Sequence, residues 1–318
     1  MSNRTISLQS LSGTGACRLG CEFFSRFHRT SDQPPTIYFP NPTWGNHHAI
    51  AKDAGLNIQT YRYLDLNNLT NPQLDLKGML ADLSAAPSGS VVLLHMCAHN
   101  PTGVDPTLDQ WRKIAECCRD HKLQIFFDNA YQGFASGDLN GDAKPLQLMV
   151  GEEFNLNVFV ACSFAKNMGL YGERIGVLHV IGPDETSAQN VFTQLKKLAR
   201  AMYSNPPQFG AMVAHEVMTH PELRGLWEEE LKGMSERINK MRLALRTSLE
   251  EKTSGQKWNH ITDQIGMFSY TGLTKAQVDK CTEAGVFMLG TGRISMAGLN
   301  EGNVDHVAEV MAKAVQSF

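Results

Sequence analysis

The stretch that decides the fold is VFVACSFAKNMGLYGERIGVLHVI, residues 158–181. An apolar run at each of its ends encloses Lys166, and each run is typical of a buried strand. Burial disfavours the charged form of a lysine and lowers its pKa, which makes the amine a usable nucleophile. Ser163 and Arg174 bracket Lys166 with a hydroxyl and a guanidinium, two groups that bind phosphate.

A lysine beside a phosphate site is the combination that pyridoxal phosphate requires. The aldehyde of this cofactor forms a Schiff base with the amine, while its phosphate anchors the ring. On its own, a lysine in a loop is a surface charge far more often than a nucleophile. The role of Lys166 therefore depends on what the rest of the chain places near it.

The composition narrows the class of protein. With 318 residues, the chain is long enough for about two domains. Its net charge of −3 and charged fraction of 19% indicate neither a nucleic-acid partner nor an anionic membrane. Its 7 cysteines include no CxxC pair, which argues against disulfides or a zinc site, so we expect no metal and a reducing compartment. No apolar run approaches the ~20 residues that span a bilayer, and the N-terminus lacks a signal-peptide core.

Helical and strand-like segments alternate through the first two thirds of the chain, which predicts an α/β domain. Residues 91–96 and 123–127 are apolar runs of the kind found in strands buried on both faces. Between them, Thr107 and Gln110 are spaced as a capping box that starts a helix. The apolar stripe of this helix is expected to include Leu108, Trp111, Ile114 and Cys118.

The pattern changes at Pro221, which suits the first turn of a long helix. Alternating spacings of four and three predict one core-facing stripe along it. The stripe consists of Trp227, Leu231, Met234, Ile238, Met241 and Leu245. Strands are expected at 266–270, 286–289 and 293–297, before a final helix that carries Val304, Val307, Val310, Met311 and Val315. We place a domain boundary inside the long helix, between a large domain at 1–232 and a small one at 233–318.

Polar residues directly follow the predicted strands. Asn100, Asp128 and Lys166 each come after one strand, and Tyr131 lies three residues beyond Asp128. Doubly wound sheets bind ligands at the carboxyl ends of their strands, so these side chains should meet. An aspartate in such a position can be merely a helix cap. As a cofactor ligand, a buried carboxylate would keep the pyridine nitrogen protonated and so make the ring an electron sink.

Other candidates carry weaker signals. Gly13 and Thr14 precede a helical stretch, whose N–H groups and dipole can bind an anion, although an ordinary N-cap is the commoner meaning. Trp44 offers an indole for stacking on a flat ring, but a lone tryptophan is more often in a core. Arg200, near a helix end, and Arg293, at a glycine turn, are candidates for binding carboxylates.

Together these features give a sequence that resembles the aspartate aminotransferases, within the fold type I class of pyridoxal-phosphate enzymes. The matching motifs follow the family's order along nearly the whole chain and are very specific as a set. They are SGTGA (12–16), PTWGNH (42–47), HNPTG (99–103), FDNAYQGFASG (127–137), the Lys166 segment, YSNPP (203–207), WNHITDQIGMF (258–268) and GRIS (292–295).

The resemblance implies a fold and a set of catalytic roles. The fold is α/β, with a mostly parallel mixed sheet in a large domain that has helices on both faces, and a smaller α/β C-terminal domain. Lys166 would be the Schiff-base lysine and the proton shuttle. Asp128, supported by His47, would pair with the pyridine nitrogen. The remaining ring contacts would be Trp44, which stacks on the ring, and Asn100 and Tyr131, which hydrogen-bond its phenolic oxygen.

The same resemblance assigns the two ends of the site. The phosphate would be bound by Gly13, Thr14, Ser163 and Arg174. The substrate would meet Trp44 and Asn100, its α-carboxylate would bind Arg293, and its side-chain carboxylate would bind Arg200 from the partner subunit of a homodimer. The implied reaction is reversible transfer of an amino group between L-aspartate and 2-oxoglutarate, giving oxaloacetate and L-glutamate.

The family carries a substantial stretch before the SGTGA motif, and only a short one precedes it here. We therefore expect a shortened member with weaker dimerisation and weaker cofactor binding. Two other functions stay open: a weakly active or inactive chain that acts as a binding partner, and a related lyase or decarboxylase, against which the paired arginines argue. The wording of the Lys166 segment resembles organelle-type members, so the chain is expected in the cytoplasm or the mitochondrion.

Overall fold

The computed structural model describes residues 3–28, 34–65 and 72–317. Seven strands form one sheet in the spatial order β1-β7-β6-β5-β4-β2-β3. Their bounds are β1 Thr5–Leu11, β2 Thr36–Asn41, β3 Asn57–Arg62, β4 Val91–His95, β5 Gln124–Asn129, β6 Val158–Ser163 and β7 Ile175–Ile181. Strand β7 pairs antiparallel with β1 and β6, and the other four pairs of adjacent strands are parallel, so the sheet is mixed and mostly parallel, as predicted.

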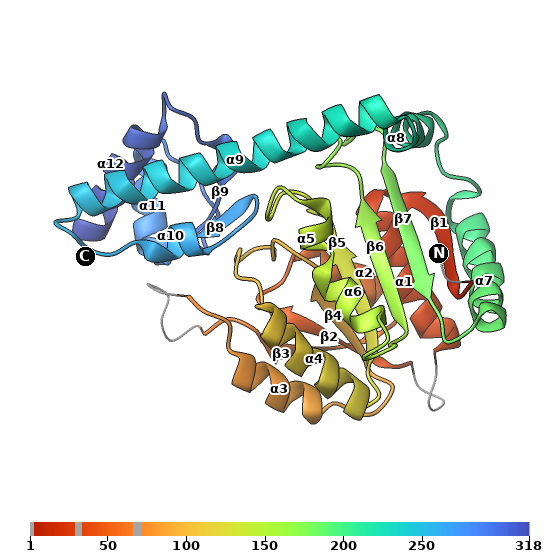
Figure 1. Ribbon diagram of the computed structural model, residues 1–318. Helices are drawn as coiled ribbons and strands as arrows, with labels where there is room; N and C mark the ends of the chain where they lie inside the picture. The colour runs from red at the N-terminus through yellow and green to blue at the C-terminus, as the bar shows by residue number, and fades with distance from the viewer. Residues whose placement is uncertain (1–2, 29–33, 66–71, 318) are drawn as a thin grey trace.

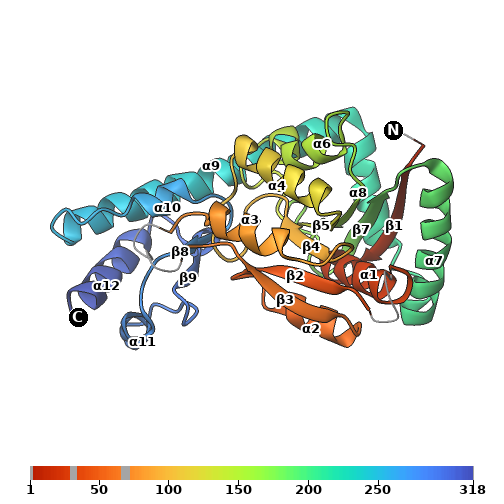
Figure 2. The same cartoon turned by 90° about the horizontal axis from the view of Figure 1, so that it is seen from below.

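Helices cover both faces of this sheet (Figures 1 and 2). Successive side chains of a strand point to opposite faces. Val91 and Leu93 of β4 accordingly join one core cluster, and Val92 and Leu94 join another. The first cluster contains residues of α1 (Ser12–Phe27), α2 (Asn46–Asp53) and α7 (Glu185–Tyr203). The second contains residues of α3 (Leu76–Ser84), α4 (Leu108–Asp120) and α6 (Lys144–Val150), which follows the short α5 (Leu139–Asp142).

Helix α4 starts with the predicted capping box. The backbone N–H of Gln110 donates to the Thr107 hydroxyl, and the backbone N–H of Thr107 donates to the Gln110 side chain. Trp111 is buried as expected, together with Ile114 and Cys118. The prediction for Leu108 is wrong, because this first residue of the helix is 45% exposed at the edge of an open surface hollow.

The predicted long helix is α9 (Pro221–Lys252), which follows α8 (Phe209–Thr219). Figure 1 shows α9 crossing from the large sheet to a smaller unit at the C-terminal end. Leu231, Ile238 and Met241 face the core, but Met234 is 39% exposed, which contradicts the predicted stripe. At that point α9 borders an open hollow lined by the adjacent Gly233.

The smaller unit is built on a two-stranded antiparallel sheet. Its elements are α10 Asn259–Asp263, β8 Phe268–Tyr270, α11 Lys275–Glu283, β9 Arg293–Ser295, the 3₁₀ turn η1 Met296–Gly298 and α12 Val304–Gln316. The strand predicted at 286–289 does not form. Val286 is buried and Met288 packs partly buried against the same core, but Phe287 is 81% exposed and Leu289 is 50% exposed, and the run pairs with no strand among the described residues. Within the described ranges, no helix is long and apolar enough to cross a membrane.

Candidate active site

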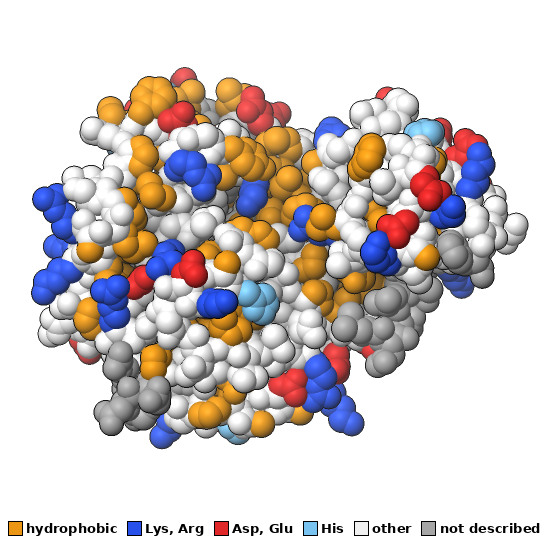
Figure 3. All heavy atoms as spheres, turned by 180° about the vertical axis from the view of Figure 1, so that it is seen from behind, with side chains coloured by type: hydrophobic (Ala, Val, Ile, Leu, Met, Phe, Trp, Pro, Cys, Tyr) orange, Lys and Arg blue, Asp and Glu red, His pale blue; other side chains and the backbone are white. Residues whose placement is uncertain are grey.

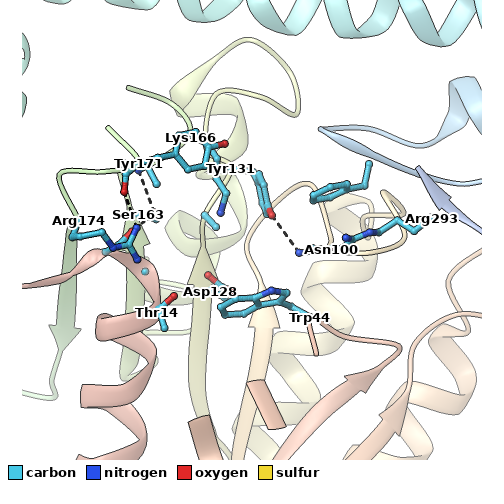
Figure 4. A pocket seen from close by; sticks show the side chains of 15 residues that line it. Thr14, Trp44, Asn100, Asp128, Tyr131, Ser163, Lys166, Tyr171, Arg174 and Arg293 are labelled. Atoms are coloured by element: carbon cyan, nitrogen blue, oxygen red, sulfur yellow. Dashed lines mark hydrogen bonds between the residues drawn. The ribbon is translucent and has the colours of Figure 1, made fainter. Parts of the chain in front are cut away.

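A cavity of about 280 Å³ lies at the carboxyl ends of β4, β5 and β6, where the parallel strands were predicted to bring their polar residues together (Figure 4). Its lining comes from both sheets and from the N-terminus of α1. The lining residues are Ser12, Gly13, Thr14, Trp44, Asn100, Asp128, Ala130, Tyr131, Ser163, Ala165, Lys166, Tyr171, Arg174, Phe268 and Arg293. Of the predicted site residues, this set lacks only His47 and Arg200.

Lys166 lies in the turn that follows β6, between two strands that are buried as predicted. Its ammonium nitrogen is 4.6 Å from the centre of the Tyr131 ring. Burial lowers the pKa of Lys166, and the nearby Arg174 guanidinium lowers it further, although the Asp128 carboxylate opposes both. The geometry therefore favours a larger fraction of neutral, nucleophilic amine than an exposed lysine has.

Asp128, at the end of β5, is held from behind by a buried histidine. Nε2 of His47 lies 3.0 Å from Oδ2 of Asp128, and Nδ1 of His47 lies 2.9 Å from the Thr43 hydroxyl. Burial would raise the pKa of Asp128, but the His47 hydrogen bond and the positive charges nearby outweigh it, so the net shift is downwards. The carboxylate is thus ionised, with only 11% of its side chain exposed. A proton on Nε2 suits this arrangement, because a carboxylate can only accept.

Further aromatic rings pack beside the His47–Asp128 pair. His95 stacks on His99 with ring centres 4.2 Å apart, and its Nδ1 accepts the backbone N–H of Asn100 at 3.0 Å. Burial lowers the pKa of His95 to about 3, so this imidazole is neutral at physiological pH. The turn that carries Asn100 is therefore fixed by an uncharged histidine one strand away from Asp128.

The opposite end of the cavity has the features of an anion site. No side chain caps the N-terminus of α1, whose first residues line the cavity. A Cβ atom on Gly13 would lie 3.0 Å from Cβ of Ser163, so only glycine leaves the backbone open here. The Ser12 and Ser163 hydroxyls are 3.1 Å apart, and Arg174 reaches the same end from the start of β7. Uncapped N–H groups, two hydroxyls and a guanidinium form a cradle that fits a phosphate.

Arg293 enters the cavity from β9, on the side opposite Arg174 (Figure 4). One of its guanidinium nitrogens donates to the Asn100 side-chain oxygen at 2.8 Å, and Asn100 in turn donates to the Tyr131 hydroxyl at 3.2 Å. The guanidinium carbon lies 4.4 Å from the centre of the Phe268 ring. Among the described residues, Arg293 forms no ion pair, so its charge is free to bind a carboxylate.

The structure does not bring Arg200 into this cavity. Arg200 lies near the end of α7, is exposed, and donates to the Ser204 hydroxyl at 2.8 Å. Five lining residues belong to the quoted motifs but had been given no role: Ser12, Ala130, Ala165, Tyr171 and Phe268. The sequence signal that could have identified them is their position inside those motifs. The same holds for Thr43, which hydrogen-bonds His47 and lies next to Trp44 in the PTWGNH motif.

Cys17 of α1 also reaches the floor of the site. One potential ligand atom each from Cys17, His47 and Asp128 lie within 4.8 Å of one another. His47 and Asp128 already hydrogen-bond each other, and burial raises the pKa of the Cys17 thiol, which disfavours the thiolate that a metal needs. We therefore interpret the trio as part of the floor of an organic cofactor site.

The family model for "Aminotransferase class I and II" matches residues 2–311. The chain belongs to this family. It is 47% identical over 310 residues to the mitochondrial aspartate aminotransferase of Dictyostelium discoideum, covering 97% of this chain and 71% of that protein. It is also 47% identical over 317 residues to the cytoplasmic aspartate aminotransferase of Schizosaccharomyces pombe, covering 99% and 76%.

The fold also matches solved structures of aminotransferases. The aromatic-amino-acid aminotransferase of Burkholderia pseudomallei, solved with covalently bound pyridoxal phosphate, superposes with a TM-score of 0.93 at 39% identity. The match covers 98% of this chain and 76% of that one. The fold predicted from the motifs is thus confirmed. The family is pyridoxal-phosphate-dependent, so the predicted cofactor is confirmed at the level of the family.

Proposed function

We propose that this chain is an aspartate aminotransferase, which transfers an amino group reversibly between L-aspartate and 2-oxoglutarate. One observation carries the proposal: a lysine amine, an ionised carboxylate and an arginine that forms no ion pair among the described residues converge on one cavity with a phosphate cradle at its far end. Identity to curated aspartate aminotransferases over nearly the whole chain supports the choice of substrate.

The residues present fit pyridoxal phosphate. Gly13, Thr14, Ser163 and Arg174 would hold its phosphate, and the bare backbone at Gly13 gives that group room. Asp128 would hold a proton on the ring nitrogen, because a carboxylate with a lowered pKa stays charged and accepts that bond. Trp44 and Tyr131 would confine the ring. When bound, the cofactor supplies an electron sink for the pair released at the substrate Cα.

Lys166 would hold the cofactor covalently and then act as the general base. Its amine can take the Cα proton only while neutral, and the lowered pKa increases that fraction. The Tyr131 ring confines the amine on one side. Burial raises the pKa of the Tyr131 hydroxyl, so Tyr131 stays protonated and can donate a hydrogen bond rather than compete as a base.

Substrate binding would use two arginines. Arg293 has the free charge and the planar fork that suit the α-carboxylate, and its bond to Asn100 sets the orientation of the fork. Arg200 cannot serve its own cavity from α7, so we infer that it serves the cavity of a second copy. This assignment makes the enzyme a homodimer.

The surface around Arg200 supports that assembly. Near it, the end of α7, α8 and the start of α9 expose several large apolar side chains, which would be covered in a dimer. They are Met202 (39%), Phe209 (70%), Met212 (60%) and Leu226 (55%). Figure 3, which is seen from behind the view of Figure 1, shows hydrophobic side chains gathered in the hollow between the large and the small lobe. We propose that these lobes are domains 1–232 and 233–318, which divide inside α9. The separate β8–β9 sheet supports this division.

The test is a transamination assay with L-aspartate and 2-oxoglutarate, run beside a measurement of oligomeric state. We expect turnover by a dimer, and a much lower kcat/KM for phenylalanine than for aspartate. No turnover by a cofactor-loaded dimer would instead favour an inactive binding partner. A preference for phenylalanine would place the chain with aromatic relatives. The compartment stays a proposal, cytoplasm or mitochondrion, since relatives of both kinds are equally similar.

A further inference from the structure

Arg242 is a fully buried arginine in the interior of α9. Its exposed fraction is 1%, and among the described residues it makes no ion pair. Burial lowers its pKa to about 10, so the guanidinium remains charged at neutral pH. A buried charge is costly unless dipoles or counter-charges replace its water.

Three backbone carbonyls replace that water. The guanidinium donates to the carbonyl of Ile261 at 2.7 Å, to that of Gly266 at 2.8 Å, and to that of Phe268. All three belong to the segment from α10 to the first residue of β8. Lysine could not reproduce this arrangement, because a single ammonium is a point charge while the guanidinium is a planar fork.

The segment that Arg242 holds packs tightly against the turn that carries Asn100. Its Ile265 N–H donates to the Gly103 carbonyl at 2.8 Å. Gly266 has φ +81°, and a Cβ there would lie 2.3 Å from Cβ of Ala98. A shift of this segment of even a fraction of an ångström would therefore be transmitted to the turn at 98–103.

The segment also ends at the substrate arginine. Phe268 stacks beneath the Arg293 guanidinium at 4.4 Å and meets the Tyr131 ring edge-on at 5.9 Å. Arg293 is bonded in turn to Asn100. Arg242 thus holds the backbone under the Phe268 ring directly, and it holds the segment that packs against the turn carrying Asn100.

We propose that Arg242 is a positioning residue for carboxylate binding: by clamping three carbonyls at the start of β8, it sets Phe268 and Asn100 so that Arg293 is aimed into the cavity. The inference rests on the proposed function, because it takes Arg293 to be the group that binds the substrate carboxylate. A merely structural arginine would change stability and cofactor retention but would leave the affinity for carboxylates in the folded, loaded enzyme unchanged.

The experiment compares wild type, Arg242→Lys and Arg242→Met as cofactor-loaded full-length proteins. The dissociation constant of succinate, an unreactive dicarboxylate, is followed by the visible absorbance of the cofactor, and cofactor content is measured per chain. Small misplacements of a positioning group can cost up to about 100-fold. We expect succinate binding and the KM for aspartate to weaken about 10- to 100-fold, with cofactor content unchanged and a smaller loss in Lys than in Met.

Arg237→Met is the matched control. Arg237 lies on the same helix and likewise donates to two carbonyls, those of Leu299 and Ala297, but neither borders the cavity. Succinate affinity should therefore stay at the wild-type value in this variant. An equal loss in Arg237→Met would show that any weakened clamp on α9 has the same effect, and would overturn the proposal.

A double-mutant cycle keeps the proposal falsifiable if Arg242→Met does not fold. Arg242→Lys and Phe268→Leu should be non-additive in succinate affinity, since both act through the support of Arg293. Wild-type succinate affinity in Arg242→Lys, or full additivity, would overturn the inference. Failure of the proposed function looks different: wild type would bind no succinate, or Arg293→Leu would bind it as well as wild type does.

Discussion

The floor of the cavity and its carboxylate-binding end are built in different ways. On the floor, Asp128 lies at the end of β5 and Lys166 lies in the turn after the adjacent β6. His47 supports Asp128 from a helix packed on that sheet. At the other end, Arg293 comes from a second sheet, and Arg200 lies outside the cavity altogether. In the proposed mechanism, the residues that do the chemistry therefore come from the large sheet of one chain, while the residues that choose the substrate come from a second sheet and from a second copy.

The largest effect should come from the floor. We expect Lys166→Ala to lower kcat by about 10⁴-fold or more, since the group that moves the proton is removed and general acid–base catalysis alone contributes up to that factor. The measurement is steady-state transamination at saturating aspartate. Lys275→Ala, at a lysine whose side chain is 75% exposed, is the control and should match wild type. Turnover near wild type in Lys166→Ala would remove the lysine from the mechanism.

Substrate charge should matter next. Truncating one partner of a desolvated charge pair typically costs about 2–5 kcal/mol, which is about 30- to 4,000-fold. Arg200→Leu should lose kcat/KM for aspartate on this scale, while amino acids with apolar side chains lose little or gain. Arg119→Leu, at another exposed arginine, serves as the control. Equal losses for acidic and apolar substrates would mean that Arg200 has a structural role and that the two ends differ less than we argue.

The smallest effect should be a change in pH dependence on the floor. His47→Ala removes the hydrogen bond that lowers the pKa of Asp128, so burial would dominate and the pKa would rise. The carboxylate then becomes protonated at higher pH, and the acid limb of the kcat profile should move upwards. A hydrogen bond to a charged group is worth about 1.5–3 kcal/mol, so we expect about a 10- to 150-fold loss below neutral pH and less above it.

His48→Ala is the control for that profile. His48 is the exposed neighbour of His47. The His48→Ala substitution should leave the acid limb of the kcat profile at the same pH as in wild type. If the His47→Ala and wild-type profiles coincide, the histidine does not hold the carboxylate ionised.

The sequence predicted the residues on the floor of the cavity well, because their positions follow from a local relation between a strand and the residues after it. A polar residue directly after a buried strand must lie at the carboxyl end of the sheet, and this placed Asp128 and Lys166 without further information. The motifs added Trp44 and His47. Apolar runs were less reliable: 286–289 contains three large apolar side chains, yet it forms no strand pairing in the described part of the chain.

Arg242 shows what sequence patterns miss. On α9 it is one of several arginines at helical spacing, and nothing in its sequence neighbours distinguishes it from Arg237, which is exposed, or Arg246, which is partly exposed. Its burial depends on carbonyls that lie 19 to 26 residues away along the chain. Such a contact follows from tertiary packing, which a local pattern does not encode.

The most direct test of the central claim is a single half-reaction. Protein loaded with pyridoxal phosphate is mixed with L-aspartate in the absence of any oxo acid, and oxaloacetate is counted per bound cofactor while the visible absorbance is followed. If Lys166, Asp128 and Arg293 act together as described, one oxaloacetate forms per cofactor and the absorbance changes in step. If aspartate binds but no oxaloacetate appears, the cavity is not a transaminase site and the account is wrong.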